Sequence, residues 1–301
     1  MNYKDWLNLW LNNYVKTSCK RRTCEMYSST IERRIVPYLG NRDLNELTPE
    51  LLQQFVINLR SSEGQALAAN TVNGVITVVQ SSLKMAHDLG YVPVYYGDKI
   101  RHPKTVEKKV ECLTVLEQKK LENYIRNDKR YKLYGIIICM YTGLRIGELL
   151  ALKWENVDMH KAQLTVESTC YYVDNKRVID TPKTQHSLRT IPFPRQILPL
   201  FRVLKKHAKT EFVIEENGVP VSNRSLQRSF ELIQKRLNIE HKCFHALRHT
   251  FATRALECGM DVKTLSELLG HKNPNVTLRR YAHSMLEHKK QMMNKLGRLF
   301  A

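Results

Sequence analysis

Apolar residues recur at three- and four-residue spacing through the first hundred residues, which is the period of an amphipathic helix. Two series illustrate it: Trp6, Leu7, Trp10, Leu11, Tyr14, and Tyr27, Ile31, Ile35, Tyr38, Leu39. Thr48 followed by Pro49 predicts the cap and first turn of a helix to about Leu59. Asn70 predicts the cap of another helix that runs to Gly90. The pattern predicts a small helical bundle.

The helical pattern stops between Tyr91 and about residue 109, where Pro93 and Pro103 accompany a basic run. Prolines at this density interrupt helices, so we predict a linker from about residue 91 and a domain boundary near residue 108. Beyond it, Thr114 and Glu117 have the spacing of a capping box. This predicts helices over 115–126 and 131–152, and the apolar run at 133–144 should be buried.

Between Ala162 and Pro192 the apolar period changes to alternation, as in LTVE (164–167) and LRTI (188–191). Alternation predicts strands, and Asp174-Asn175-Lys176 predicts a turn between two of them. Lys183 should lie on a loop at the edge of this small antiparallel sheet, after which helical periodicity resumes to the end. The predicted fold class is mainly α with a small antiparallel sheet, and 301 residues are enough for two domains.

The chain is strongly basic, with a formal net charge of +19 and a pI near 9.6. Residues 1–108 hold 14 basic and 10 acidic residues, whereas the rest of the chain holds 34 and 19. Such an excess favours a polyanionic partner, most commonly nucleic acid. On charge alone, a basic protein of the translation or lipid-binding type is also compatible.

Seven cysteines occur without any Cys-x-x-Cys pair, which argues against a disulfide framework and against a zinc ribbon. A reducing cytoplasm is therefore expected. The first residues lack the basic-then-apolar pattern of a secretion signal. No segment approaches the roughly 20 apolar residues that span a bilayer, so no membrane association is expected.

The second half contains a set of side chains suited to breaking a phosphodiester without metal or nucleotide: Arg145, Lys183, His245, Arg248, His271 and Tyr281. Arginine binds phosphate oxygens bidentately, and a phenol can act as a nucleophile. Taken singly, most have ordinary explanations. Arg145, for example, could form a helix ion pair with Glu148 three residues on.

His241, His245 and His249 recur at four-residue spacing, which allows an alternative interpretation as metal ligands. A zinc helix of the His-Glu-x-x-His type needs a glutamate that this segment lacks. We therefore favour the phosphate-binding interpretation, in which His245 and Arg248 lie one turn apart on the same helical face.

Four motifs carry these residues in a fixed order: TGLRIGEL (142–149), TPKTQHSLRTIP (181–192), HALRHTFAT (245–253) and LLGH (268–271). Gly270 predicts the C-cap of one helix, and Asn273-Pro274 predicts the start of the next, which runs through Tyr281, so His271 should lie in the tight turn between them. This order and spacing resemble the tyrosine recombinase, or phage integrase, family. In motif the chain is most similar to integrases of conjugative transposons and phages.

The resemblance implies a helical core-binding (SAM-like) DNA-binding domain over residues 1–108 and a catalytic domain with a helical tail over 109–301. Family members close both domains around double-stranded DNA at recombination sites, act as homotetramers and work with accessory DNA-bending or excision factors. Cleavage forms a 3′-phosphotyrosine, and strand exchange passes through a Holliday junction. No metal or other cofactor is needed, and a bacterial cytoplasmic, nucleoid-associated location follows.

The resemblance also assigns roles to the site residues. Arg145 and Arg248 clamp the scissile phosphate, and Glu148 supports Arg145. Tyr281 is the nucleophile, with His245 as its base or proton acceptor. Lys183 protonates the departing 5′ oxygen, and His271 donates a hydrogen bond to a non-bridging oxygen.

Three other functions stay open from the sequence: a Xer-type resolvase, a type IB topoisomerase-like relaxing enzyme that uses the same residues, and a non-catalytic DNA-binding regulator. The last should have lost the tyrosine or an arginine, and neither is lost. Many integrases begin with a further arm-binding domain, whereas this sequence opens on the helical region, as Xer-type resolvases do. The tail from Ser284 to Ala301 is expected to be an amphipathic helix that docks on its own or a neighbouring subunit.

Overall fold

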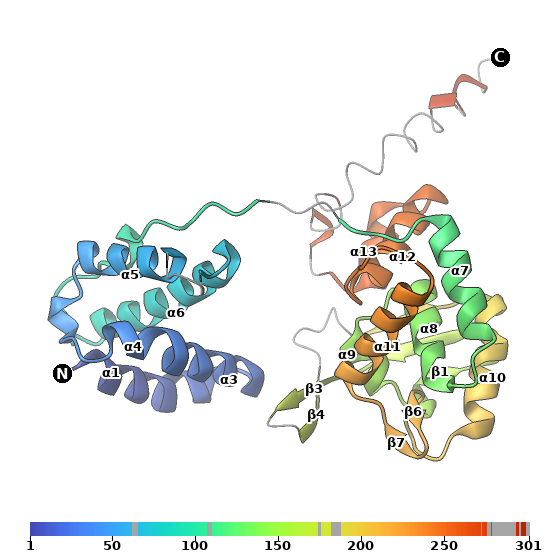
Figure 1. Ribbon diagram of the computed structural model, residues 1–301, viewed down its shortest axis with the longest axis horizontal. Helices are drawn as coiled ribbons and strands as arrows, with labels where there is room; N and C mark the ends of the chain where they lie inside the picture. The colour runs from blue at the N-terminus through green and yellow to red at the C-terminus, as the bar shows by residue number, and fades with distance from the viewer. Residues whose placement is uncertain are drawn as a thin grey trace. The chain divides into compact units, whose positions relative to one another are not determined.

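A computed structural model describes residues 1–61, 66–106, 110–173, 176–181 and 188–271, together with 273–275, 278, 293–294 and 296–298. The chain divides into two compact units, Met1–Lys108 and Lys109–Ala301, both drawn in Figure 1. Across these ranges, no helix combines the length and apolar character that crossing a membrane requires.

The first unit is helical, with two long helices that each contain a π-helical segment. One comprises α1 (Tyr3–Trp10), η1 (Leu11–Val15) and α2 (Lys16–Ser18), and the other α3 (Arg21–Thr30), η2 (Ile31–Ile35) and α4 (Val36–Leu39). The remaining elements are the 3-10 turns η3 (Leu44–Glu46) and η4 (Gly97–Lys99) and the helices α5 (Pro49–Ser61) and α6 (Ala69–Asp88).

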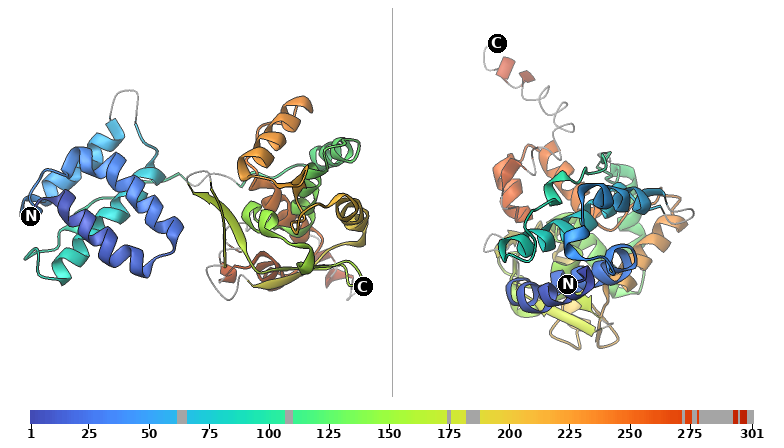
Figure 2. Two further views of the ribbon diagram at one scale, coloured as in Figure 1. Left: turned by 90° about the horizontal axis from the view of Figure 1, so that it is seen from below. Right: turned by 90° about the vertical axis from the view of Figure 1, so that its left-hand side faces the viewer.

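Helix α6 is the centre of this unit, because α1, α3 and α5 all contact it (Figures 1 and 2). Its buried positions follow the helical period and meet the fully buried Tyr3 and Trp6 of α1. Ser82 joins the two helices: its backbone carbonyl accepts from Trp6 Nε1 at 3.1 Å, and its hydroxyl lies 2.7 Å from the Tyr3 hydroxyl. The predicted helical bundle is confirmed.

The predicted cap of α6 is wrong by two residues. Its N-cap is Ala68, which has an extended backbone and makes no side-chain cap bond. The incoming chain is held instead by a bond from the Leu67 N–H to the Leu59 carbonyl of α5, 3.0 Å long. Tertiary contact, rather than the capping preference of Asn70, therefore fixes where the helix begins.

The segment predicted as a linker from residue 91 remains bonded to the first unit as far as Pro103. Val92 and Ile100 are buried in its core. Asn73 of α6 donates to the Pro103 carbonyl at 3.3 Å, and its side-chain oxygen lies 3.0 Å from His102 Nδ1. The backbone N–H of Arg101 donates to Gln53 of α5 at 3.0 Å.

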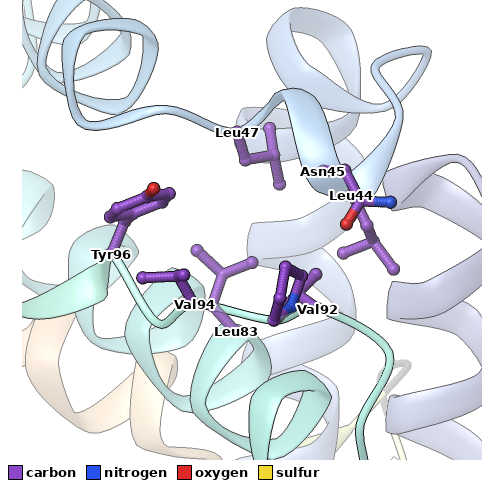
Figure 3. Close-up of a pocket in the computed structure, with 8 residues that line it drawn as sticks. Leu44, Asn45, Leu47, Leu83, Val92, Val94 and Tyr96 are labelled. Atoms are coloured by element: carbon purple, nitrogen blue, oxygen red, sulfur yellow. The ribbon is translucent and has the colours of Figure 1, made fainter.

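A cavity of about 100 Å³ lies between the turn at Leu44 and the segment after α6 (Figure 3). Its lining is apolar except for Asn45 and the phenol of Tyr96, and it contains no acidic or basic side chain. This cavity therefore offers no cation to bind a phosphate, and its one titratable side chain is the phenol of Tyr96.

The second unit is built on α8 (Tyr134–Thr142), a helix buried on nearly all sides that contacts α7, α9 and α12. The other helices and turns are α7 (Val115–Arg126), η5 (Tyr131–Leu133), α9 (Ile146–Ala151), η6 (Trp154–Asn156), η8 (Arg195–Ile197), α10 (Leu198–His207), α11 (Asn223–Arg236), α12 (Ala246–Glu257) and α13 (Val262–Leu269). The capping box of Thr114 and Glu117 opens α7 as predicted.

The helix predicted over 131–152 is interrupted at Gly143, which has a left-handed φ of 66° and ends α8. A Cβ at this position would lie 2.5 Å from Phe251 of α12 and 3.0 Å from Leu269 of α13. Glycine is required for both reasons. Because α8 stops here, Arg145 becomes the N-cap of α9 instead of an interior helical residue.

The strands form separate small antiparallel sheets rather than one. β1 (Val157–Asp158), β2 (Gln163–Val166) and β5 (Arg189–Pro192) form a three-stranded sheet in the order β1-β2-β5. β3 (Thr169–Val173) pairs with β4 (Lys176–Asp180), and β6 (Glu215–Glu216) with β7 (Val219–Pro220). The predicted turn at Asp174 and Asn175 lies outside the described residues. The fold class, mainly α with small antiparallel sheets, is confirmed.

We expect Ser82→Ala to lower the free energy of unfolding by about 1–3 kcal/mol, the cost of an unsatisfied buried hydroxyl. Ser82 Oγ donates its proton to the Val79 carbonyl, so the buried Tyr3 hydroxyl must be the donor in their contact. Removing the Ser82 hydroxyl leaves the buried Tyr3 hydroxyl without this hydrogen-bond acceptor. Chemical denaturation followed by tryptophan fluorescence reports on this unit through Trp6 and Trp10.

The double variant Tyr3→Phe, Ser82→Ala is the control, because it removes both hydroxyls. It should be more stable than the single Ser82→Ala variant. Equal or lower stability of the double variant would contradict the assigned bond.

Candidate active site

Arg145 and Glu148 are joined at the start of α9. The Arg145 backbone N–H donates to Glu148 Oε2 at 2.9 Å, and its guanidinium Nη1 donates to Oε1 at 2.6 Å. The side chain of Glu148 is 6% exposed, whereas that of Arg145 is 37% exposed. Glu148 therefore holds Arg145 from inside the protein while part of the guanidinium faces solvent.

Arg248 lies in the first turn of α12 and is 2% exposed. Its Nη1 donates to the Gly143 carbonyl at 2.8 Å, and its Nη2 donates to the Leu269 carbonyl at 2.5 Å. Nη2 also lies 3.0 Å from His271 Nε2. Arg248 thus ties the glycine break before Arg145 to the turn that carries His271.

His271 directly follows the left-handed C-cap of α13, Gly270, as predicted. Gly270 has a φ of 65°, and the backbone N–H of His271 donates to the Ser266 carbonyl at 3.0 Å. This bond pattern closes the end of α13 and fixes the direction of the chain beyond it. Asn273 accepts from the backbone N–H of Asn275 at 2.9 Å, and Pro274 and Asn275 are helical.

His245 is the N-cap residue of α12, and its ring is exposed. Its imidazole stacks edge-on against His249, with ring centroids 4.7 Å apart. The segment before it is anchored by Lys242, whose backbone N–H donates to Gln234 Oε1 at 2.8 Å and whose carbonyl accepts from Gln234 Nε2 at 3.0 Å. His245 and Arg248 are one turn apart, but the histidine faces solvent while the arginine is buried.

Lys183 and Tyr281 lie outside the described residues. Of the six predicted site residues, Arg248 contacts His271 and the carbonyl of Gly143, two residues before Arg145, and His245 lies one helical turn from Arg248. In sequence, Lys183 falls between the end of β4 at Asp180 and the start of β5 at Arg189. The tail predicted at 284–301 is also almost wholly outside the described residues.

The structure adds Arg189, which the sequence did not single out. Its side chain is only 6% exposed and makes two bonds to Glu148, from Nη2 to Oε2 at 2.8 Å and from Nη1 to Oε1 at 3.2 Å. A signal was present: in β5, Arg189 occupies the same face as Ile191, which is fully buried. A cation on the inward face of a strand needs a buried partner.

Glu148 remains ionised despite its burial. Burial alone would raise the pKa of this carboxyl, but the hydrogen bonds and charge of Arg189, followed by the charge of Arg145, lower its pKa to about 2. The site is therefore a fixed anion flanked by two guanidinium groups, with Arg248 and His271 beside them. Of the three guanidinium groups, that of Arg145 is partly exposed and is therefore suited to bind an anionic oxygen.

No group of three or more His, Cys, Asp or Glu side chains within the described ranges is arranged to hold a metal ion. His241, the first residue of the alternative metal set, is 69% exposed and lies 4.0 Å from Glu231. Of that set, His245 and His249 contact each other.

The depressed pKa of Glu148 predicts how stability responds to acid. The ordinary pKa is 4.5 and the folded value is about 2, so this group contributes about 3 kcal/mol of stability above pH 4.5 that is lost as pH falls towards 2. Glu148→Gln removes this titration. Its free energy of unfolding should fall less than that of the wild type over this window.

Denaturant unfolding at several pH values between 4.5 and 2 measures the difference. Glu155→Gln is the matched control, since Glu155 is 70% exposed and pairs only loosely with Lys153 at 3.5 Å. Parallel pH profiles for Glu148→Gln and the wild type would contradict the assignment.

Comparison with known proteins identifies the family of the chain. Residues 111–288 match the phage integrase family, and residues 2–59 match the N-terminal SAM-like domain of phage integrases. A XerC-like tyrosine recombinase of Caldanaerobacter subterraneus is 27% identical, over 98% of this chain and 83% of that protein. The transposase of transposon Tn916 from Enterococcus faecalis is 26% identical, over 86% of this chain and 69% of that protein.

The fold is also that of a solved integrase. The integrase of transposon Tn1549, in complex with a circular intermediate DNA, has a TM-score of 0.82 at 23% identity, covering 98% of this chain and 99% of that one. The main family match alone covers more than half of the sequence and includes every residue of the predicted site. The chain belongs to the phage integrase family of tyrosine recombinases.

Proposed function

We propose that this protein is a site-specific recombinase that cuts and rejoins double-stranded DNA through a 3′-phosphotyrosine on Tyr281. The observation that carries the proposal is the set of contacts made by Arg248, which joins the carbonyl of Gly143, two residues before Arg145, to the carbonyl of Leu269 and to His271. Three groups able to stabilise a phosphate thereby come from three distant parts of the chain. The family match spans Lys183 and Tyr281 as well.

In the proposed reaction, the arginines stabilise charge that grows on the non-bridging oxygens. Arg145 is suited to direct contact because its guanidinium is partly exposed while Glu148 holds its inner side. His271 lies beside Arg248 and donates a hydrogen bond to the same phosphate. Groups held before the reaction begins need no reorganisation when the charge develops.

Tyr281 attacks phosphorus, and the bond to the 5′ oxygen breaks. A phenol of pKa about 10 is mostly protonated at neutral pH, so a base must accept its proton. His245 fits this role because it is exposed at the N-terminus of the helix that carries Arg248. Lys183 gives a proton to the departing 5′ oxygen. The reverse steps, with the 5′ hydroxyl of a partner strand, rejoin the DNA and exchange strands through a Holliday junction.

No cofactor enters this scheme, because the phosphotyrosine conserves the energy of the broken bond. We assign core DNA binding to residues 1–108, which include the SAM-like match, and catalysis to residues 109–301. The working assembly is a homotetramer on two recombination sites, aided by accessory DNA-bending or excision factors. It acts on nucleoid DNA in the bacterial cytoplasm.

The biological role we favour is integration and excision of a mobile element, which the similarity to the Tn916 transposase supports. The similarity to a XerC-like recombinase supports a second role, the resolution of chromosomes or plasmids. The DNA that flanks the gene distinguishes them. Repeats that bracket the gene indicate a mobile element, and their absence favours resolution.

Tyr281→Phe should abolish covalent adduct formation on a nicked suicide substrate, because phenylalanine has no oxygen to attack phosphorus. DNA affinity should be retained. Denaturing gel electrophoresis detects the adduct, and a mobility shift measures binding. Tyr172→Phe, which changes a partly exposed tyrosine of β3, is the matched control and should form the adduct. An adduct that persists in Tyr281→Phe would refute the nucleophile assignment.

The Lys183→Ala variant should cleave an ordinary substrate roughly 10²–10⁴-fold more slowly than the wild type, which is the usual contribution of a general acid. A substrate with sulfur in the 5′-bridging position should restore cleavage, because a thiolate leaves without protonation. Arg145→Ala is the control, since its defect lies in phosphate binding and sulfur should not rescue it. Failure of sulfur to rescue Lys183→Ala would argue against the acid role.

A further inference from the structure

Arg189, which lies in β5, forms hydrogen bonds to two other elements of the site, α9 and α13. It is the first residue of β5, and it binds both oxygens of Glu148 in α9. Its Nε donates to the Leu268 carbonyl of α13 at 2.6 Å. One side chain therefore connects the carboxylate that holds Arg145 with the helix end that carries His271.

These bonds close a ring around the site. Arg145 binds Glu148, Glu148 binds Arg189, and Arg189 binds the Leu268 carbonyl. The next carbonyl, that of Leu269, accepts from Arg248, and Arg248 also donates to the carbonyl of Gly143, two residues before Arg145. Displacement of any one member therefore alters the positions of the phosphate-binding groups on both sides.

We propose that Arg189 is a positioning residue for the recombination reaction, which sets the relative placement of Arg145 and His271 through Glu148 and the Leu268 carbonyl. The inference rests on the proposed function. Arg189 is not assigned a contact with DNA, because its side chain is buried. Its effect is on the geometry of the groups that meet the phosphate.

The chemistry of the guanidinium explains why arginine occupies this position. Its planar fork presents Nη1 and Nη2 to the two carboxylate oxygens while Nε points to a third acceptor. A lysine ammonium in the same place would keep the charge beside Glu148 but could not hold all three acceptors in one plane. The Arg189→Lys variant therefore distinguishes a positioning role of Arg189 from a purely electrostatic one.

Gly270 makes room for this arrangement. A Cβ on Gly270 would lie 3.0 Å from Arg189 Nη1 and 3.2 Å from its Cδ. The left-handed glycine that turns the chain towards His271 therefore also admits the guanidinium against the end of α13. The turn and the arginine form one packed unit.

The test compares DNA affinity with single-turnover cleavage of a nicked suicide substrate at saturating DNA, using the full chain. Arg189→Lys should slow cleavage by roughly 10- to 100-fold, the scale expected for a misplacement of about 1 Å, with little change in affinity. Arg195→Lys is the matched control, because Arg195 is exposed just beyond β5. It should cleave at the wild-type rate.

Arg189→Ala provides a second arm that does not depend on a lysine fitting the site. Guanidinium ion at millimolar concentration should partly restore cleavage by this variant, whereas ammonium at the same ionic strength should not. A purely structural loss of stability would not discriminate between the two cations. Thermal melts of each variant accompany the rate measurements.

Wild-type cleavage at saturating DNA by Arg189→Lys would overturn the inference, as would a defect confined to DNA affinity. Equal effects of guanidinium and ammonium on Arg189→Ala would also count against it. The proposed function fails differently, since a wild-type protein that forms no adduct with any suicide substrate would refute it whatever the variants do.

Discussion

Glu148 is buried between two guanidinium groups, and the arrangement of the site depends on its negative charge. A buried carboxylate without partners would bind a proton and lose its hold on both arginines. Arg189 and Arg145 prevent this by keeping the pKa of Glu148 at about 2. In return, the negative charge of the carboxylate offsets the repulsion between the two guanidinium groups, so that they can lie close together.

Around this anion the second unit assembles elements that are far apart in the sequence. Arg189, the first residue of β5, binds the anion directly, and Arg248 in the first turn of α12 joins the glycine break after α8 to the end of α13. The helices are placed by the buried core around α8, and the polar contacts then set their ends in register. Hydrophobic packing brings these helix and strand ends close to one another, and the hydrogen bonds of Arg189 and Arg248 then fix their relative positions.

Much of this could be predicted from the sequence, and the limits have physical causes. Helical periodicity and the capping box at Thr114 depend on residues that are close in sequence, so they could be predicted from the sequence. The break at Gly143 was not predicted; the left-handed φ of this residue ends α8, and Phe251 and Leu269, more than a hundred residues away, leave no room for a Cβ there. The start of α6 was likewise determined by a bond to α5 rather than by the local cap.

The same distinction applies to the site. Motif order singled out Arg145, His245, Arg248 and His271 as candidates, and the predicted Gly270 cap is confirmed. The ion pair between Arg145 and Glu148 was anticipated, but as a contact along a helix rather than a bond across its first turn. Arg189 was missed because a charged residue in a hairpin is usually exposed, and only the partner supplied by α9 explains its burial.

Arg248 is anchored by main-chain oxygens, those of Gly143 and Leu269, and this has a consequence for altering the enzyme. Carbonyl acceptors persist whichever side chains are attached to the backbone. Substitutions at surrounding positions therefore leave the guanidinium with its acceptors, provided that the two left-handed glycines remain. An engineer seeking new DNA targets would vary exposed side chains other than Arg145 and His245 and would keep Gly143 and Gly270 unchanged.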